Sequence, residues 1–188
     1  GKKTDTGDAE GNIIQEEKVD IPWKDKQALE KVFQSFVGKQ EQVPPMYSAI
    51  KVKGKKLYEY ARKGEQVEIP VRQIEIYQIK IQQIEELKQQ IVFQVSCSKG
   101  TYIRSLCEDI AEKLGTVGYM QELQRIQVGD FRIEQAVTIE QLEKDNIPYL
   151  SVEKLFENKE SIFLERKRLH LFLNGVKPRM FDEWQMNP

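Results

Sequence analysis

The sequence has few of the residues from which metal centres and disulfide frameworks are built. It contains two cysteines, Cys97 and Cys107, and a single histidine, His170. The cysteines stand ten residues apart without companions, a spacing that suits neither a zinc site nor a set of disulfides. We therefore expect no metal site, and we expect both cysteines to be core residues of a reduced, cytoplasmic protein. We assign His170 no catalytic role.

Long apolar runs and an excess of one charge are also missing. No stretch approaches the length of a membrane span, which predicts no contact with a membrane, and no signal peptide is visible. The net charge of −1 means that any contact with nucleic acid must come from a local basic patch. With 188 residues, the chain is expected to form one domain, or one domain and a small second one.

The patterns that are present predict an α+β fold, with a mixed, mostly antiparallel sheet flanked by helices. Residues 21–38 and the stretch from Gly100 to Gly115 have helical periodicity. Residues 71–86 and 90–98 read as a strand hairpin, with a one-residue slip between Ile76 and Tyr77 that predicts a bulge.

The last third of the chain carries three further local signals. Residues 123–135 look like a hairpin that turns near Gly129 and Asp130. Thr138 and Gln141 have the spacing of a capping box at the start of a helix. Residues 168–180 are expected to begin a new strand-turn unit.

A basic arm interrupts the regular patterns at "VPPMYSAIKVKGKKLYEYARKG", residues 43–64. Between residues 51 and 63 the local net charge is about +5, and tyrosines are interleaved with the lysines. Phosphates attract lysines, and aromatic rings can stack on unpaired bases, so RNA binding is one hypothesis. A solvated loop with its tyrosines folded onto the core is the other.

Arg104 raises the question of why a cation stands in the first turn of a helix, in "CSKGTYIRSL", residues 97–106. The helix dipole disfavours positive charge at that end. Arg104 could simply face solvent. It could instead be a buried cation whose planar fork holds a carboxylate or a phosphate. The residues alone leave both interpretations open.

Four blocks occur in the same order as in a known family of RNA-modifying enzymes. They are "TDTGDAEG" (4–11), "FVGKQEQVPPMYSAIKVKGKKLYEYARKG" (36–64), "VSCSKGTYIRSLCEDIAEKLG" (95–115) and "LQRIQVGDF" (123–131). Together they resemble the bacterial tRNA pseudouridine-55 synthases of the TruB type, over roughly residues 1–145. The shorter "LFLNGVKPR" (171–179) resembles the opening of the small, β-rich PUA-type RNA-binding domain of that family.

The resemblance implies a domain organisation and a reaction. Residues 1–147 would be part of the synthase domain, with a thumb-like RNA-binding arm at 38–68, and 148–164 would connect it to the PUA-type domain beginning at 165–188. The reaction would convert uridine 55 in the T-arm of tRNA to pseudouridine, without a cofactor or a metal. The protein would act as a monomer.

The family's functional residues can be placed on matching positions of this sequence. Arg104 would pair with the catalytic aspartate, Tyr102 would line the uracil pocket, and Leu123 would contact the target nucleotide. Arg125, expected in the same strand as Leu123, would support that wall. The residues expected to bind RNA are Tyr47, Lys51, Lys53, Lys55, Lys56, Tyr58, Arg62, Lys63, Lys99 and Arg125.

One departure from the family pattern matters. The "LDP" motif with the catalytic aspartate and the upstream base-stacking tyrosine are absent, and Asp5 and Asp8 belong to a different block. We therefore expect this chain to be an internal piece of a longer synthase, inactive by itself. Two alternatives are a non-catalytic module that binds or folds tRNA, and an α+β interaction domain whose basic arm is incidental.

Overall fold

The computed structural model describes residues 1–144, 150–160, 164 and 166–176. The chain groups into two compact units, residues 1–126 and 127–188. The domain boundary predicted near residue 147 falls within the second unit and on residues outside the described part of the chain, so it stays a prediction. No helix in the described ranges is long and apolar enough to cross a bilayer.

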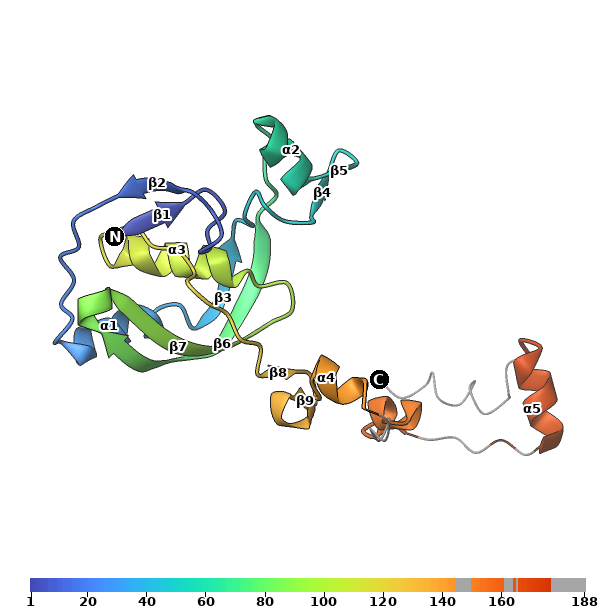
Figure 1. Cartoon of the computed structure of the whole chain (residues 1–188). Helices are drawn as coiled ribbons and strands as arrows, with labels where there is room; N and C mark the ends of the chain where they lie inside the picture. The colour runs from blue at the N-terminus through green and yellow to red at the C-terminus, as the bar shows by residue number, and fades with distance from the viewer. Residues whose placement is uncertain (145–149, 161–163, 165, 177–188) are drawn as a thin grey trace. The chain divides into compact units, whose positions relative to one another are not determined.

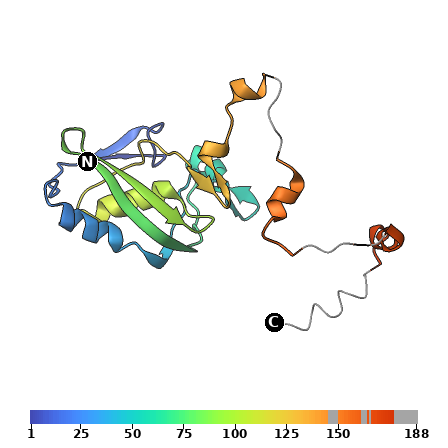
Figure 2. The same ribbon diagram turned by 90° about the horizontal axis from the view of Figure 1, so that it is seen from below.

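The first unit is built around a three-stranded antiparallel sheet in the order β3-β6-β7. Its strands are β3 (Gly38–Gln42), β6 (Arg72–Glu85) and β7 (Gln90–Cys97). The short 3-10 turn Glu86–Lys88 joins β6 to β7 in a long hairpin, and α3 (Ile103–Lys113) lies against it (Figures 1 and 2). The expected α+β fold is confirmed.

The core of this unit packs α1 (Lys26–Gln34) and α3 against β6. Leu29 and Phe33 come from α1, and they pack with apolar residues of β6 and α3. On β6 the register shifts between Ile76 and Gln78, so the predicted slip is confirmed. The bulge keeps Ile76 and Ile79 buried on one face, which alternation without an extra residue cannot do.

Both predicted helices form, with ends set by their caps. The α1 helix starts later than its sequence pattern suggests, because the Asp25 carboxylate accepts a hydrogen bond from the backbone N–H of Ala28 at 3.0 Å. The α3 helix ends at Lys113 with Leu114 as its C-cap, and Gly115 follows with φ +81°, the left-handed conformation that glycine adopts readily.

Two small hairpins complete the first unit. The pair β1 (Lys2–Thr4) and β2 (Ile13–Glu16) carries the "TDTGDAEG" turn between its strands. The pair β4 (Lys51–Val52) and β5 (Lys55–Lys56) leads into α2 (Leu57–Lys63). Figure 1 shows β4, β5 and α2 projecting as an arm from the end of the sheet where β3 leaves and β6 enters.

The second unit contains short elements. Its hairpin is β8 (Gln127–Val128) and β9 (Phe131–Arg132), followed by the 3-10 turn Ile133–Gln135 and by α4 (Ile139–Leu142). The 3-10 helix Val152–Phe156 and α5 (Arg166–Leu173) follow. The predicted hairpin is confirmed. So is the capping box, in which Thr138 N donates to Gln141 Oε1 at 2.8 Å and Gln141 N to Thr138 Oγ1 at 3.3 Å.

The strand expected to begin at residue 168 is wrong, because residues 168–173 lie in α5. Leu169, Leu171 and Leu173 alternate as in a strand, but Leu169, Phe172 and Leu173 also have helical i, i+3, i+4 spacing. Gly175, at φ +80°, follows the helix. The PUA-type domain at 165–188 stays a prediction, since residues 177–188 lie outside the described part.

The two cysteines are half-buried rather than fully in the core. Burial, with smaller contributions from the neighbouring Glu108 and Asp109 carboxylates, raises the pKa of the Cys107 thiol to about 12. At pH 8 only about one Cys107 thiol in ten thousand is then the reactive thiolate.

We therefore expect Cys107 to resist alkylation in the folded chain. In a Cys97→Ser variant at pH 8, iodoacetamide should modify Cys107 about 10³-fold more slowly than in the urea-unfolded chain. Mass spectrometry of timed samples measures both rates. Equal rates would show that the thiol is not protected.

Candidate functional site

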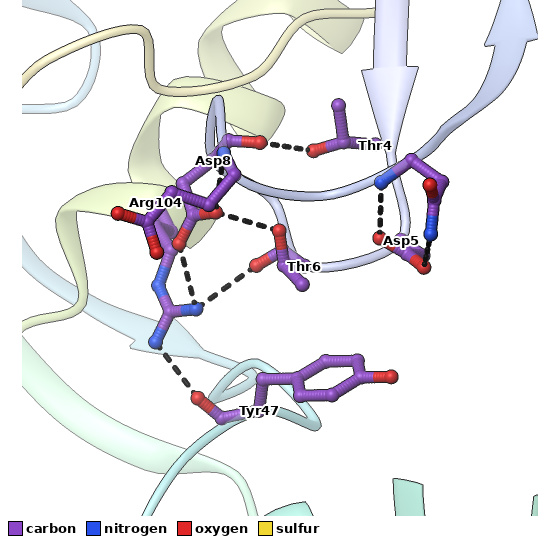
Figure 3. A network of polar contacts seen from close by, with 8 residues as sticks. Thr4, Asp5, Thr6, Asp8, Tyr47 and Arg104 are labelled. Carbon is purple, nitrogen blue, oxygen red and sulfur yellow. Dashed lines mark hydrogen bonds and ion pairs between the residues drawn. The ribbon is translucent and has the colours of Figure 1, made fainter. Parts of the chain in front are cut away.

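Arg104 lies in the first turn of α3 and joins two distant segments of the chain. Its Nη1 donates to Asp8 Oδ2 at 3.1 Å and to the carbonyl oxygen of Thr6 at 3.0 Å, and its Nη2 donates to the carbonyl oxygen of Tyr47 at 2.8 Å (Figure 3). The Arg104 and Asp8 side chains are only 21% and 23% exposed. The arginine therefore holds a carboxylate, as the buried-cation interpretation requires, and does not simply face solvent.

The turn between β1 and β2 is built to present Asp8. Thr6 Oγ1 donates to Asp8 Oδ1 at 2.6 Å, and Thr4 Oγ1 donates to the Asp8 carbonyl oxygen at 2.7 Å. Gly7 adopts φ +76°, and a Cβ there would lie 3.5 Å from Arg104 Cβ. The turn thus needs small, hydroxyl-bearing residues and a glycine, which explains the composition of "TDTGD".

Asp5 has a different task from Asp8. Its carboxylate accepts hydrogen bonds from the backbone N–H and the side-chain amide of Asn12, at 2.9 and 3.3 Å. It therefore closes the base of the turn, and in Figure 3 it lies apart from Arg104. Neither aspartate lies in the block that carries the catalytic one in the family, and the sequence pattern does not reveal that Asp8 pairs with Arg104.

Arg104 keeps donors to spare. A guanidinium has five N–H groups. Thr6, Asp8 and Tyr47 accept from three of them, two on Nη1 and one on Nη2. Within the described residues, the Nε–H and the second Nη2–H have no hydrogen-bond partner. They leave Arg104 able to bind a second carboxylate while it holds Asp8.

Gln42 fixes the backbone of Tyr102, two residues before Arg104. Its Nε2 donates to the Tyr102 carbonyl oxygen at 3.0 Å, and Tyr102 N donates to Gln42 Oε1 at 2.8 Å. Ser105 Oγ donates to the carbonyl oxygen of Val43 at 2.9 Å. The end of β3 is thereby attached to the start of α3. The role of Gln42 was not predicted, because a glutamine just before "VPP" carries no signal of a contact with Tyr102.

Replacement of Gln42 by leucine should destabilise the fold. Gln42 is 4% exposed, and leucine would leave the Tyr102 N–H unpaired and the Tyr102 C=O with only its bond from Leu106 N. We expect a loss of about 2–4 kcal/mol in the free energy of unfolding, measured in urea. Gln73→Leu is the control, because it removes one exposed bond to Glu41 and should change stability by about 0.5 kcal/mol or less. Equal losses in both variants would contradict this role of Gln42.

Leu123 and Arg125 lie in a coil segment before β8, so the expectation that they share a strand is wrong. Leu123 is 43% exposed, and Arg125 is exposed. The segment that leads to them runs beside the Asp8 turn, where Met120 N donates to the Gly7 carbonyl oxygen at 3.0 Å. Among the described contacts, no hydrogen bond or ion pair joins Leu123 or Arg125 to Arg104.

The arm keeps most of its charge in solvent. Lys51, Lys53, Lys55, Arg62 and Lys63 are exposed, and Lys56 and Tyr58 are half-buried. No ion pair neutralises these six basic residues within the described part of the chain. Lys99, in the turn between β7 and α3, is also exposed. The arm projects as expected, and its surface suits a polyanion.

The arm also has a small core of its own. Leu57 is fully buried, Ile50 and Tyr60 are each 8% exposed, and Tyr60 Oη donates to the carbonyl oxygen of Val52 at 2.9 Å. Tyr60 is thus a structural residue of the arm. Tyr47 touches the Arg104 site through its carbonyl group, while its ring points away (Figure 3).

A second carboxylate lies one turn beyond Arg104. Burial raises the pKa of the Glu108 carboxyl above its usual value, and the Lys3 and Arg104 cations offset part of that rise. Lys3 Nζ lies 3.8 Å from Glu108 Oε1.

Within the described residues, no group of three or more histidine, cysteine or acidic side chains has the arrangement of a metal site.

Comparison with known proteins assigns this arrangement to a class. Residues 1–103 match the model of the TruB family pseudouridylate synthase N-terminal domain, and residues 104–156 match that of the tRNA pseudouridylate synthase B C-terminal domain. A chain in the crystal structure of a Cbf5-Nop10-Gar1 complex is similar, with a TM-score of 0.52 and 28% identity over 69% of this chain and 35% of that one. The class is that of the pseudouridine synthases.

The relatives define the family within this class. The tRNA pseudouridine synthase B of Psychrobacter cryohalolentis is 51% identical over 76% of this chain and 39% of its own length. That of Clostridium tetani is 41% identical over 100% of this chain and 65% of its own length. The chain belongs to the TruB family of pseudouridylate synthases. It spans less than two thirds of the length of these two relatives.

Proposed function

We propose that the complete protein containing this chain is a tRNA pseudouridine synthase that isomerises uridine 55 in the T-arm. The observation that carries the proposal is the Arg104 site, in which a partly buried arginine holds Asp8 and retains two N–H donors for another carboxylate. The nucleophilic aspartate would be supplied by a part of the protein outside these 188 residues.

The residues of this chain would serve the reaction by positioning. The uridine must leave the helical stack to be reached, and a carboxylate then assists cleavage of its N1 glycosidic bond. The uracil turns, the bond re-forms through C5, the C5 proton is lost and N1 gains one, so atoms balance without a cofactor. Tyr102 and Leu123 would form the wall that retains the detached base. Arg104 would keep the aspartate ionised and aimed.

RNA binding would depend mainly on the arm. Its exposed lysines provide a local positive charge on a chain whose net charge is −1. Phosphate contacts of this kind position an RNA without reading its sequence. Lys99 and Arg125 would add contacts outside the arm. We propose tRNA as the substrate and the cytoplasm as the location, with the protein acting as a monomer.

The proposal is tested with the complete synthase and a T-arm stem-loop RNA. After incubation with saturating enzyme, digestion and nucleoside chromatography should show one pseudouridine per RNA. A stem-loop with cytidine at the target position should yield none. Tight binding of the RNA without any pseudouridine would overturn the proposed reaction and favour the non-catalytic tRNA-binding module.

A further inference from the structure

Tyr58 in the arm has two cations over its ring. Lys56 Nζ and Arg62 Cζ each lie 5.3 Å from the ring centroid, and Lys56 Nζ also donates to Tyr58 Oη at 3.2 Å. These three residues, called here the Tyr58 cluster, come from the end of β5 and from α2. A tyrosine face attracts cations through its quadrupole, and the Tyr58 hydroxyl accepts from Lys56, so this one side chain contacts both cations.

The cluster gathers like charges without a carboxylate between them. In the described part of the chain neither Lys56 nor Arg62 has an ion-pair partner, whereas Arg104 is paired with Asp8. Glu59 is the nearby acid in sequence, and its carboxylate accepts from the backbone N–H of Lys56 at 3.4 Å. Both cations lie 5.3 Å from the same ring centroid, and an anion that binds both of them lowers their mutual repulsion.

The position of these cations also affects whether an RNA base can stack on Tyr58. Arg62 lies over the Tyr58 ring, on a face where a base would otherwise stack, and Lys56 lies toward the hydroxyl end of the ring, where its Nζ donates to Oη. A ring occupied in this way serves the cations rather than a base. The exposed Arg62 offers a planar fork that matches phosphate oxygens, and Lys56 offers a point charge.

We propose that Lys56, Tyr58 and Arg62 form a clamp for a backbone phosphate of RNA, in which Tyr58 is the platform that orients the two cations and does not stack on a base. The inference rests on the proposed function, because the phosphate is that of the RNA bound by the arm. It makes Tyr58 a positioning residue that acts through Lys56 and Arg62.

A mutant cycle tests the clamp in the 188-residue chain. Binding is measured for a T-arm stem-loop RNA and for an abasic sugar-phosphate oligonucleotide of equal length. Tyr58→Leu should weaken both by about fivefold to tenfold, and Tyr58→Phe, which keeps the ring, should bind nearly as the wild type. In a chain that already carries Lys56→Gln and Arg62→Gln, Tyr58→Leu should have no further effect. Tyr77→Leu, at a 56% exposed tyrosine of β6, is the control and should change nothing.

Two other outcomes would contradict the clamp, and they distinguish its failure from the failure of RNA binding by the arm. If Tyr58→Leu weakens binding of the stem-loop alone, and does so equally in the double variant, Tyr58 stacks on a base and the clamp is wrong while RNA binding stands. If the wild-type chain binds neither the stem-loop nor the abasic oligonucleotide, the arm is not an RNA-binding surface. Both the clamp and the proposed role of the arm in RNA binding are then wrong. Circular dichroism of each variant confirms that α2 and the rest of the chain remain folded.

Discussion

Replacement of Arg104 by alanine in the complete synthase is expected to abolish uridine isomerisation while leaving tRNA binding nearly unchanged. Arg104 faces the reacting carboxylate in the proposed mechanism, whereas affinity comes mainly from backbone phosphates and the arm. Loss of an oriented charge at a reacting centre, together with misplacement of that centre, should lower the single-turnover rate by about 10³-fold or more. The rate is measured at saturating enzyme, so that weaker binding cannot imitate the effect.

The structure supplies controls for this variant. Alanine also removes the bonds to Thr6, Asp8 and Tyr47, so thermal unfolding must show that the variant remains folded. Arg104→Lys keeps the charge but not the fork, and it should still lose most of the activity because one ammonium cannot reach all the acceptors of a guanidinium. Glu112→Ala, exposed two turns further along α3, should keep the wild-type rate. A wild-type rate for saturated Arg104→Ala would show that Arg104 has no part in the reaction.

Replacement of the four arm lysines by alanine is expected to have the converse effect. The variant removes Lys51, Lys53, Lys55 and Lys56, which should weaken tRNA binding and flatten its dependence on salt. Each lost phosphate contact reduces the slope of log K against log salt by about 0.7–0.9, so the loss of four such contacts should reduce it by about 2.8–3.6. Filter binding across a series of salt concentrations measures both quantities.

A charge-matched variant makes this test specific. Lys18, Lys24, Lys26 and Lys31 are also exposed, but they lie in and before α1, outside the arm. Their replacement removes the same charge and should leave the slope nearly unchanged. At saturating enzyme the arm variant should still isomerise uridine, since Arg104 is intact. An unchanged salt slope in the arm variant would mean that the arm does not contact phosphates.

The parts of the fold that follow from local periodicity could be predicted from the sequence. The β6–β7 hairpin, its slip after Ile76, and α3 with its end at Gly115 all depend on residues close together in the chain. Periodicity alone could not predict α5, because its leucines fit the alternation of a strand as well as the spacing of a helix.

The contacts of the site depend on residues far apart, and no local pattern encodes them. Asp8 and Arg104 are separated by 96 positions, and Gln42 and Tyr102 by 60. The cost of a cation at the start of α3 suggested a bound anion as one of two interpretations of Arg104, and the residues alone could not choose between them. Whether Tyr102, Leu123 and the arm residues have the roles implied by the family stays a prediction.

The hydrogen bond from Arg104 to Tyr47 makes the base of the arm and the Asp8 turn parts of one linkage. If RNA binds the arm as proposed, a displacement of the arm on binding would reach the guanidinium through this 2.8 Å contact. Coupling between two binding events is reciprocal, so if RNA binding to the arm changes the affinity of Arg104 for a second carboxylate, that carboxylate changes the affinity of the arm for RNA by the same factor. In such a linkage, the affinity for RNA would depend on whether Arg104 has bound the second carboxylate.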